Sequence, residues 1–415
     1  MFENKRYGVI GEHLAHSRSK EIHARFGYDY SVNELKPEEL GDFVQHSGYD
    51  GFNVTIPYKK AVMPYLSRID AYAAACGAVN TVVKEPYGYV GYNTDVFGLV
   101  YMIKSAGMSL QGKKTLILGK GGAALAAYAA AKELNAAEIL FITRGGADNF
   151  GNLERHSDAE IIINATPVGM YPNAGESAVD LSVFDKPSAA VDLVYNPLKT
   201  AFIFQAELLG IPYVSGLKML VAQAKYAAEL FTGEAYLDSV IEEIYRDMYF
   251  EASNIVLIGM PSSGKTEIGK LLAEKTGKAF ADTDEVIERD TGITIPEIFR
   301  TQGEAAFREY ERRVIDEYGR MSGRIISTGG GSVTVSGAYS ALKQNGIAVH
   351  LVRDKAKVDP TGRPLLSEPG AYERLGAVRM PAYKRFADVT VSNDGEKEKT
   401  VEEILKKAKA FIAEQ

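Results

Sequence analysis

Residues 259–266 read Gly259-Met260-Pro261-Ser262-Ser263-Gly264-Lys265-Thr266. An apolar run with strand character (254–258) precedes this stretch, and a helical pattern (265–275) follows it. A glycine-containing turn between a strand and a helix presents converging backbone N–H groups, which bind phosphate oxygens. In this context the lysine is predicted to neutralise the β- and γ-phosphates, and the threonine hydroxyl to ligate Mg²⁺. The stretch therefore predicts a site for Mg²⁺ and a nucleoside triphosphate in the last third of the chain.

The rest of the chain is too long to be an extension of this loop. About 250 residues precede it, so at least one further domain is expected. The 415 residues are 46% hydrophobic and 24% charged, enough apolar material for two or three cores. The net charge of −7, without a Lys/Arg cluster interleaved with aromatics, argues against a nucleic-acid partner.

Cysteine usage and the N-terminus bear on the cellular compartment. The single cysteine, Cys76, lies among alanines and is expected to be a small buried side chain. One cysteine excludes an internal disulfide and fits a reducing compartment. Residues 1–10 lack a signal-peptide core, and no apolar run approaches the roughly 18 residues of a membrane span. We therefore expect a soluble, cytoplasmic protein that does not contact a membrane.

Strand and helix patterns alternate over the first hundred residues. Strands are expected at 7–10, 29–35 and 51–56, with helices from about residue 20 and at 37–46, a rhythm that implies a parallel sheet. The hydroxyls of Ser17 and Ser19 stand at a helix entry, where they either cap the helix or bind a carboxylate. Lys59 follows the third strand, where a lysine is ordinarily solvated.

Four polar groups occur in this order: Ser17/Ser19, Asn53/Thr55/Lys59, 77–81 and 93–95. Together they resemble the substrate domain of shikimate dehydrogenases. The resemblance implies that the two serines bind the substrate carboxylate, and that Lys59 and Asp95 form a catalytic dyad. Reducing a ketone requires a proton as the hydride arrives, and an ammonium beside a carboxylate can supply it. Which member moves the proton stays open. The resemblance assigns the ring hydroxyls to Thr55, Asn80 and Asp95.

A second glycine turn lies between an apolar strand (114–118) and a helical stretch (124–134). Strand, turn and helix together indicate the pyrophosphate turn of a dinucleotide fold. The next strand (138–142) ends in Thr143 and Arg144 and not in an acidic residue. A cation there favours the 2′-phosphate of NADP, although NAD and a plain surface arginine stay open.

Strands at 160–164 and 189–194 and a helix at 216–224 also resemble the dehydrogenases. The resemblance implies that Leu193 lines the nicotinamide site and that Tyr195 and Gln223 approach the substrate. The chain then crosses to the cofactor lobe near residue 97 and returns near residue 215, with a cleft between the lobes. A helix at 235–249 and a short linker (251–253) follow. The expected NADP-binding residues are Gly119, Gly121, Gly122, Ala123, Thr143, Arg144, Leu193 and Gly216.

Beyond the phosphate loop, a short strand (279–281) runs into Asp282-Thr283-Asp284. An acidic pair facing Mg·ATP suits one carboxylate for a metal-bound water and one for an acceptor hydroxyl, with helix capping as the alternative. Residues 303–308 and a strand at 325–328 entering three glycines (329–331) complete a pattern that resembles shikimate kinases. Arg308 could also be half of a surface ion pair with Glu304.

This second resemblance implies that Asp284 contacts the acceptor hydroxyl, Arg308 and Arg379 the substrate carboxylate, and Gly330 the ring. Two arginines fit because guanidinium groups bind carboxylates in a bidentate manner. The chain departs from the family at Ser262, where glycine is usual, and in the short segment between 353 and 363. Metal contacts are expected from Thr266 and Asp282. The expected ATP-binding residues are Ser262, Ser263, Gly264, Lys265, Thr266 and, from a lid, Arg363.

The sequence thus predicts an α/β fold in two parts. Residues 1–250 form a two-lobed dehydrogenase (substrate lobe 1–97 and 216–250, Rossmann-like NADP lobe 98–215), and residues 253–415 a P-loop kinase with a parallel sheet. The implied reactions are NADPH-dependent reduction of 3-dehydroshikimate and Mg·ATP-dependent phosphorylation of shikimate. An NAD-dependent quinate or shikimate dehydrogenase fused to a kinase, or a ligand sensor without activity, are the alternatives. The oligomeric state is not predicted.

Overall fold

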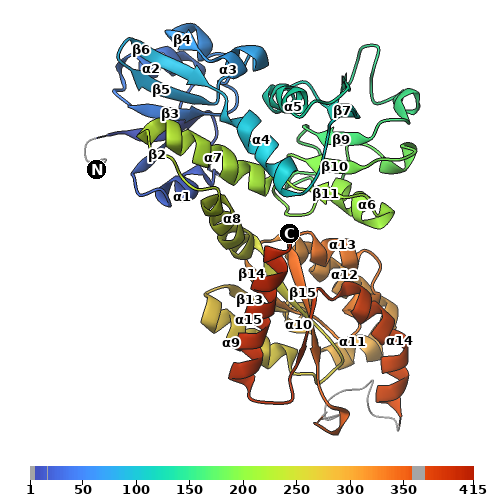
Figure 1. Ribbon diagram of the computed structural model, residues 1–415. Coiled ribbons are helices and arrows are strands. Elements are labelled where there is room, and N and C mark those ends of the chain that lie inside the picture. Colours follow the sequence, from blue (N-terminus) through green and yellow to red (C-terminus); the bar gives the residue numbers. More distant parts are fainter. Residues whose placement is uncertain (1–4, 16, 358–369) are drawn as a thin grey trace. The chain divides into compact units, whose positions relative to one another are not determined.

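A computed structural model of the chain describes residues 5–15, 17–357 and 370–415. The chain divides into two compact units (Figure 1). The first contains the residues up to Asn196 and Thr200–Tyr245, and the second contains Pro197–Lys199 and Arg246–Gln415. Both units are built from strands and helices in alternation, and the predicted α/β class is confirmed.

The first sheet has the strand order β2-β1-β3-β5-β6-β4. Its strands are β1 Tyr7–Gly11, β2 Tyr30–Glu34, β3 Gly51–Val54, β4 Arg68–Ile69, β5 Thr81–Glu85 and β6 Gly88–Tyr92. Strand β1 pairs in parallel with β2 and β3, as predicted, but β5 runs antiparallel to β3 and β6. The parallel sheet was expected for the strands up to residue 56 and is confirmed for them. Strand β5 is antiparallel because two residues alone separate it from β6, and so short a turn joins only antiparallel strands.

Helices α4 and α7 connect the two lobes of the first unit. The helices of this unit are α1 Ser19–Ala24, α2 Leu40–His46, α3 Ala71–Cys76, α4 Thr94–Ser105, α5 Gly122–Glu133, α6 Ala201–Leu209 and α7 Leu217–Thr232. At Gly98 of α4, an added Cβ would lie 2.8 Å from the Met219 carbonyl oxygen and 2.9 Å from the Gln223 nitrogen. The close approach of the two backbones requires glycine at this position, and the resulting contact holds α4 and α7 side by side (Figure 1).

The second sheet is wholly parallel, in the order β11-β10-β9-β7-β8. Its strands are β7 Lys114–Leu118, β8 Glu138–Ile142, β9 Ile161–Asn164, β10 Ala189–Asp192 and β11 Tyr213–Val214. The chain leaves β7 toward β8 on one side and continues with β9 on the other, so the strand order reverses between β7 and β9. Ligands of open α/β sheets bind at the carboxyl ends of strands where this reversal occurs.

The sheet of the second unit is also wholly parallel, in the order β13-β14-β12-β15-β16. Its strands are β12 Asn254–Ile258, β13 Ala279–Asp282, β14 Arg324–Ser327, β15 Gly346–Val352 and β16 Val389–Ser392. Its helices are α9 Lys265–Thr276, α10 Thr283–Thr291, α11 Ile295–Thr301, α12 Gly303–Arg320, α13 Ala338–Lys343, α14 Ala371–Phe386 and α15 Lys397–Ala413.

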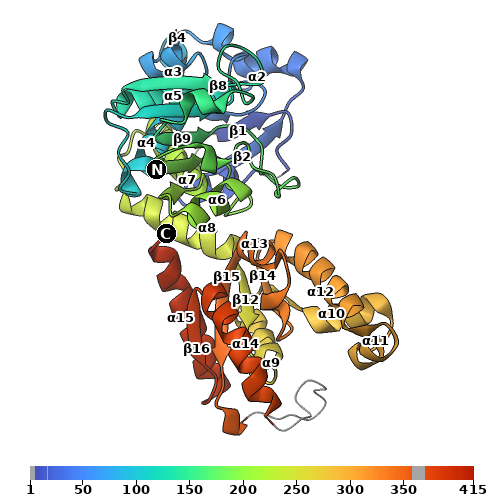
Figure 2. The ribbon, with the colours of Figure 1, turned by 90° about the vertical axis from the view of Figure 1, so that its right-hand side faces the viewer.

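Strand β12 lies between two cores, which explains its continuous apolar sequence. Val256 and Ile258 pack into the core that contains Tyr383 of α14, whereas Ile255 and Leu257 pack into the core beneath α9 and α15 (Figure 2). Successive side chains of a strand point to opposite faces, so a sheet covered by helices on both sides buries every residue of its central strand.

Helix α8 (Ser239–Ala252) contains residues of both units. The linker expected at 251–253 is wrong in part, because Glu251 and Ala252 continue the helix and β12 begins at Asn254. Only Ser253 separates the two elements, and its N–H and hydroxyl both donate to the Tyr249 carbonyl oxygen. The helix thus ends with its last backbone acceptors satisfied.

Candidate active sites

Lys59 and Asp95 form a shielded ion pair in the first lobe. Lys59 follows β3, and Asp95 lies in the first turn of α4. Nζ of Lys59 donates to Oδ2 of Asp95 at 2.6 Å, and Nδ2 of Asn80 donates to Oδ1 at 2.8 Å. The Lys59 and Asp95 side chains are 20% and 11% exposed. Both carboxylate oxygens are engaged, so the ammonium is held in one place while one side stays open to solvent.

Asn80 is itself fixed by Thr94. Its Oδ1 accepts a hydrogen bond from the Thr94 backbone N–H at 2.7 Å, which ties the residue before β5 to the start of α4. Thr81 Oγ1 accepts from Asn53 Nδ2 at 3.0 Å and lies 3.0 Å from Thr94 Oγ1. No role was predicted for Thr81 and Thr94. Both lie inside the two polar groups at 77–81 and 93–95, and this position in the sequence was the signal that could have identified them.

The serine turn leads into α1. Ser19 begins α1, and Ser17 Oγ accepts its backbone N–H at 3.3 Å, so a capping contact is present. Burial raises the pKa of Tyr195, and the guanidinium of Arg18 acts in the opposite direction. The Thr55 methyl group lies 2.7 Å from the position of a Cβ on Gly11, at the end of β1.

Gln223 is buried on α7, where its Nε2 donates to the Leu220 carbonyl oxygen at 2.8 Å, within its own helix. Arg363 lies outside the described residues.

The glycine turn after β7 stands at the point of strand reversal. At Gly119, with φ +105°, an added Cβ would lie 3.2 Å from Thr166 Cγ2 and 3.3 Å from the Ala165 carbonyl oxygen, both beyond β9. Gly121 caps α5 without a side-chain cap, and a Cβ there would meet nothing within 4 Å. The turn thus offers unblocked helix N–H groups beside open space, which fits a pyrophosphate. Ala123 is half-buried in the same turn of α5.

The glycine turn also lies beside the ion pair. A Cβ on Gly122 would be 3.5 Å from Cδ of Lys59. Because Lys59 comes from the first lobe and Gly122 from the second, this contact brings the two predicted sites together. A dinucleotide on the turn and a substrate at the ion pair would therefore be neighbours.

Leu193 and Gly216 meet on the same side of the second sheet. An added Cβ on Gly216 would lie 2.2 Å from the Leu193 carbonyl oxygen, so only glycine fits. Arg144 is exposed after β8, and Thr143 Oγ1 donates to the Gly145 carbonyl oxygen. A cation in a solvated position can meet a 2′-phosphate without a desolvation penalty.

A buried network that the sequence analysis missed supports these loops. Asp192 is fully buried and accepts from Thr200 Oγ1 at 2.5 Å, Asn164 Nδ2 at 2.9 Å and the Val194 N–H at 3.0 Å. Burial raises the pKa of Asp192 to about 6, against the effect of these donors. Asn164 in turn accepts from Thr166. The network fixes the carboxyl ends of β9 and β10, next to Gly119 and Leu193.

The phosphate loop of the second unit begins and ends in left-handed backbone. Gly264 has φ +89°, and a Cβ there would lie 2.3 Å from Asn393 Nδ2, which donates to the Ser263 carbonyl oxygen. Nζ of Lys265 donates to the carbonyl oxygens of Gly259 and Met260, at 2.9 Å each. The ammonium is therefore held over the loop. Asn393, from a distant part of the sequence, was not predicted.

Ser262 also has a left-handed backbone, with φ +64°. This explains why glycine is the residue expected at this position of the loop.

Thr266 and Asp282 supply oxygen ligands at the end of the loop. Thr266 Oγ1 donates to Asp282 Oδ2 at 2.6 Å, and Asp282 Oδ1 caps α10 by accepting the Asp284 N–H at 3.0 Å. Because the two contacts use different oxygens, Asp282 can cap α10 and also lie beside the metal. Mg²⁺ retains several waters and needs few protein ligands, so a hydroxyl and one carboxylate fit it.

Arg308 lies between a buried carboxylate and an exposed one. It pairs with Glu311 at 2.6 Å and with Glu304 at 2.9 Å, so the surface-pair alternative is correct for Glu304 but incomplete. Glu311 is fully buried and also accepts from Ser332 Oγ at 2.6 Å. Burial lowers the pKa of Arg308 but the two carboxylates outweigh it, so the net direction is upward. Arg379 is 6% exposed on α14.

The three glycines after β14 lie among these groups. A Cβ would lie 2.8 Å from Asp284 Oδ1 at Gly329, 2.9 Å from Pro261 Cδ at Gly330 and 2.5 Å from Arg308 Nη1 at Gly331. The glycine backbone therefore fills the space between the phosphate loop, the acidic pair and the arginine. This arrangement brings the predicted acceptor residues against the predicted nucleotide site.

Two further findings concern the described residues as a set. In the described ranges, no helix is long and apolar enough to span a membrane. Among the same residues, no three His, Cys, Asp or Glu side chains gather as a metal cluster. Cys76 is 2% exposed, and burial raises the pKa of its thiol to about 11, which fits the buried role expected for it.

Comparisons with known proteins match both units. The family model of the shikimate dehydrogenase substrate binding domain matches residues 9–82, and that of shikimate kinase matches residues 261–409. An NADP(+) shikimate dehydrogenase of Clostridium perfringens is 36% identical over 266 residues, which cover 59% of this chain and 98% of the relative. One from Caldanaerobacter subterraneus is 37% identical over 273 residues, with the same coverage.

Solved structures agree with these matches. A chorismate mutase/shikimate 5-dehydrogenase fusion protein from Clostridium acetobutylicum is 36% identical, with a TM-score of 0.56 over 59% of this chain and 97% of that one. Shikimate 5-dehydrogenase from Thermus thermophilus, in complex with NADP(H) and shikimate, is 31% identical, with a TM-score of 0.53 over 59% of this chain and 99% of that one. With almost the full length of such relatives covered, the chain belongs to the shikimate dehydrogenase family and carries in addition a shikimate kinase domain.

Proposed function

We propose that the chain is a bifunctional enzyme that reduces 3-dehydroshikimate to shikimate with NADPH and phosphorylates shikimate at its 3-hydroxyl with Mg·ATP. The observation that carries the proposal is the presence of two polar constellations on one chain. The Lys59–Asp95 pair lies beside the glycine turn at Gly122, and the phosphate loop lies against the acceptor glycines at Pro261 and Gly330. The product of the first reaction is the acceptor of the second, which favours both assignments together.

In the reduction, bound NADPH supplies the hydride. Nζ of Lys59 carries the transferable proton, because its partner Asp95 accepts from both Lys59 and Asn80 and so acts as an ionised carboxylate. We therefore assign the proton donor to Lys59 and the orienting role to Asp95. General acid catalysis of this kind contributes about 10²- to 10⁴-fold in rate. The serine turn would bind the substrate carboxylate, and Tyr195 would approach the substrate.

In the phosphorylation, Mg·ATP supplies the phosphoryl group. Asp284 is placed beside Gly329 to accept the proton of the attacking hydroxyl, and Lys265 stands over the loop to meet the phosphates. Arg308 and Arg379 would fix the acceptor through its carboxylate. Phosphoryl transfer is catalysed mainly by positioning and by electrostatic stabilisation, and these residues lie on helices, strands and the loops between them, which would hold them in position.

The domain bounds follow the same division. We propose that residues 1–250 are the dehydrogenase, with a substrate lobe (1–97 and 216–250) and an NADP lobe (98–215), and that residues 253–415 are the kinase. The exposed Arg144 supports NADP over NAD. The proposed partners are these small-molecule substrates.

One incubation tests the proposal. Purified protein is mixed with 3-dehydroshikimate, NADPH, ATP and Mg²⁺, and the loss of NADPH absorbance is followed together with product mass. We expect shikimate 3-phosphate, and we expect the reaction to stop at shikimate when ATP is omitted. Oxidation of NADPH without phosphorylated product would contradict the kinase assignment, and no oxidation of NADPH would contradict the dehydrogenase assignment.

A further inference from the structure

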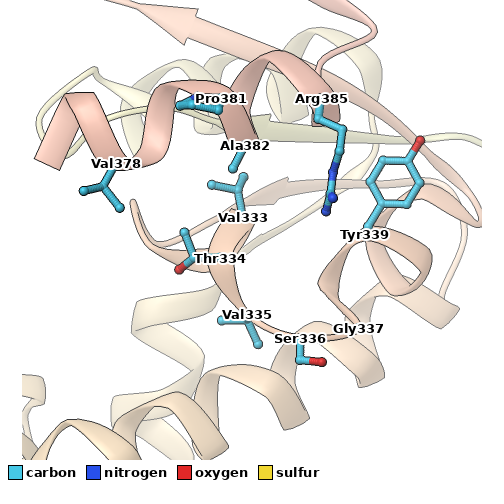
Figure 3. A pocket seen from close by; sticks show the side chains of 10 residues that line it. All are labelled: Val333, Thr334, Val335, Ser336, Gly337, Tyr339, Val378, Pro381, Ala382 and Arg385. Atoms are coloured by element: carbon cyan, nitrogen blue, oxygen red, sulfur yellow. The ribbon is translucent and has the colours of Figure 1, made fainter.

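A surface groove of about 540 Å³ lies in the second unit, apart from the residues assigned above. One wall is the segment 333–339, which contains the end of the short helix η5 (Ser332–Thr334) and the start of α13. The other wall is the face of α14 that carries Val378, Pro381, Ala382 and Arg385 (Figure 3). The volume is within the range of small-molecule sites.

The groove combines aliphatic surface with one cation, and the hydroxyl-bearing side chains Thr334, Ser336 and Tyr339 also line it. Val333, Val335 and the α14 residues Val378 and Ala382 supply aliphatic surface, and Val378 is 72% exposed. The Arg385 guanidinium lies at one end, 5.5 Å from the centroid of the Tyr339 ring. Figure 3 shows the arginine extending beside that ring. Within the described ranges, no carboxylate forms an ion pair with Arg385, so the aromatic face holds a cation that is not neutralised.

This combination selects for one ligand chemistry. A guanidinium binds a carboxylate through two parallel hydrogen bonds, and the aliphatic walls favour an apolar body next to that carboxylate. Inorganic phosphate fits less well, because it requires several donors. The Thr334 hydroxyl already donates to the Gly331 carbonyl oxygen. The Arg385 guanidinium is the charged donor among the lining residues, and the Ser336 hydroxyl is a neutral one.

Both walls of the groove carry residues of the proposed acceptor site. On α14, Val378 precedes Arg379, and Ala382 precedes Tyr383, whose hydroxyl donates to the Gly330 carbonyl oxygen at 2.5 Å. The other wall continues directly from the three glycines, and Thr334 is tied to Gly331. A ligand wedged between the walls therefore acts on the two elements that position Gly330 and Arg379.

We propose that this groove binds a small monocarboxylate with an apolar body, and that its occupancy weakens acceptor binding by the kinase domain. The second clause rests on the kinase function proposed above, whereas the first does not. Separating the walls would displace Gly330 relative to Arg379, so the KM for shikimate should rise. The dehydrogenase reaction of the same chain should not change.

Isothermal titration calorimetry with phenylacetate tests the binding. Shikimate is kept at saturation, because phenylacetate could otherwise bind the paired arginines Arg308 and Arg379. The variants are Arg385→Gln, which removes the cation, and Ala382→Leu, which fills the groove. Lys384→Gln is the matched control, because it removes an exposed cation from the neighbouring position of the same helix. Inorganic phosphate is titrated in parallel.

We expect phenylacetate to bind the wild type and the control alike, and at least about tenfold more weakly to both variants, with phosphate weaker than phenylacetate. We also expect phenylacetate to raise the kinase KM for shikimate at least threefold in the wild type but not in Arg385→Gln. Equal binding of phenylacetate by the wild type and Arg385→Gln would overturn the site. Binding without a change in KM would overturn the coupling. Absence of kinase activity would refute the proposed function and leave the calorimetric result intact.

Discussion

Nζ of Lys59 lies 2.6 Å from Oδ2 of Asp95, in a pair that crosses 36 residues of sequence. The carboxylate is held from the other side by Asn80, so the ammonium cannot move without breaking a short contact. We predict that Lys59→Met lowers the kcat of the dehydrogenase by about 10²- to 10⁴-fold, because the proton donor is lost while the substrate contacts remain. The kcat is measured from the rate of NADPH oxidation under stopped-flow or steady-state conditions.

The chain provides its own control for this variant. Phosphorylation of added shikimate depends on the other unit and should keep its rate in Lys59→Met, which shows that the substitution acts on the dehydrogenase unit alone. A loss of less than about tenfold in the reductase would show that Lys59 does not donate the proton.

Gly331→Ala should damage acceptor binding in the kinase. The added Cβ would lie 2.5 Å from Nη1 of Arg308, whose other contacts, to Glu311 and Glu304, leave it little room to move. Displacing one charge-assisted contact to a carboxylate costs about 1.5–3 kcal/mol, so the KM for shikimate should rise about tenfold or more. The KM for ATP should change little.

Gly395→Ala is the matched control for that substitution. It lies in the same unit, and a Cβ there would meet nothing within 4 Å. If both alanine variants raise the KM for shikimate equally, the crowding at Arg308 is not the cause.

Strands and turns whose signals are local were predictable from the sequence. The bounds of β7, β8 and β12 agree with the predicted ranges, because each is a largely apolar run that a glycine or polar turn ends. The glycine turns and the helices that follow them were equally visible. Their backbone conformations depend on residues within a few positions of each other.

Contacts between distant segments were not predictable in the same way. Asn393 bonds to Ser263 across 130 residues, and Leu198 to Asn345 across 147 residues, and neither pair has a pattern in the sequence. Glu311 has the spacing of a surface ion pair but is fully buried. Burial of a polar group depends on which elements pack against it, and periodicity alone does not carry that information.

The left-handed backbone of Ser262 predicts a stabilising substitution. A left-handed backbone destabilises the folded state by about 1–2 kcal/mol for a residue with a Cβ. Glycine removes this strain, but its larger unfolded-state entropy offsets part of the gain. We therefore expect Ser262→Gly to raise the melting temperature of the kinase unit by about 2–4 °C. Differential scanning calorimetry checks this, with the dehydrogenase transition as internal reference.

Ser263→Gly is the comparison for Ser262→Gly. Ser263 is buried, and its hydroxyl lies 3.4 Å from Nζ of Lys265, so its removal should lower the melting temperature. A decrease in Ser262→Gly as well would mean that the contacts of that side chain outweigh the backbone strain.

Arg144→Ala should change cofactor choice. If the exposed guanidinium meets the 2′-phosphate, its removal should raise the KM for NADPH about tenfold to a hundredfold while leaving that for NADH almost unchanged. Initial rates with each cofactor measure the ratio. Lys120→Ala is a comparison in the neighbouring glycine turn, where the pyrophosphate is common to both cofactors, so any effect should be equal for NADPH and NADH. An equal loss with both cofactors in Arg144→Ala would contradict recognition of the 2′-phosphate.

His23 makes the first unit sensitive to acid. The ring is fully buried, stacks on Tyr30 with centroids 4.0 Å apart, and its Nδ1 lies 2.5 Å from the Tyr28 hydroxyl. Burial lowers the pKa of His23 to about 3, against the effect of a hydrogen bond with Asn53. The unfolded chain binds the proton first, so this contribution to stability is complete above pH 6.5 and is lost as the pH falls toward 3. From the dependence of the free energy of unfolding on pH, we expect this free energy to fall by about 2 kcal/mol between pH 6.5 and 5.

Denaturant unfolding of wild type and His23→Gln at pH 7, 6 and 5 isolates this contribution. The glutamine does not titrate, so the free-energy difference between the two proteins should shrink by about 2 kcal/mol from pH 7 to pH 5, even though the variant is less stable at pH 7. If the difference in free energy of unfolding between wild type and His23→Gln does not change with pH, protonation of His23 is not the cause of the loss of stability in acid.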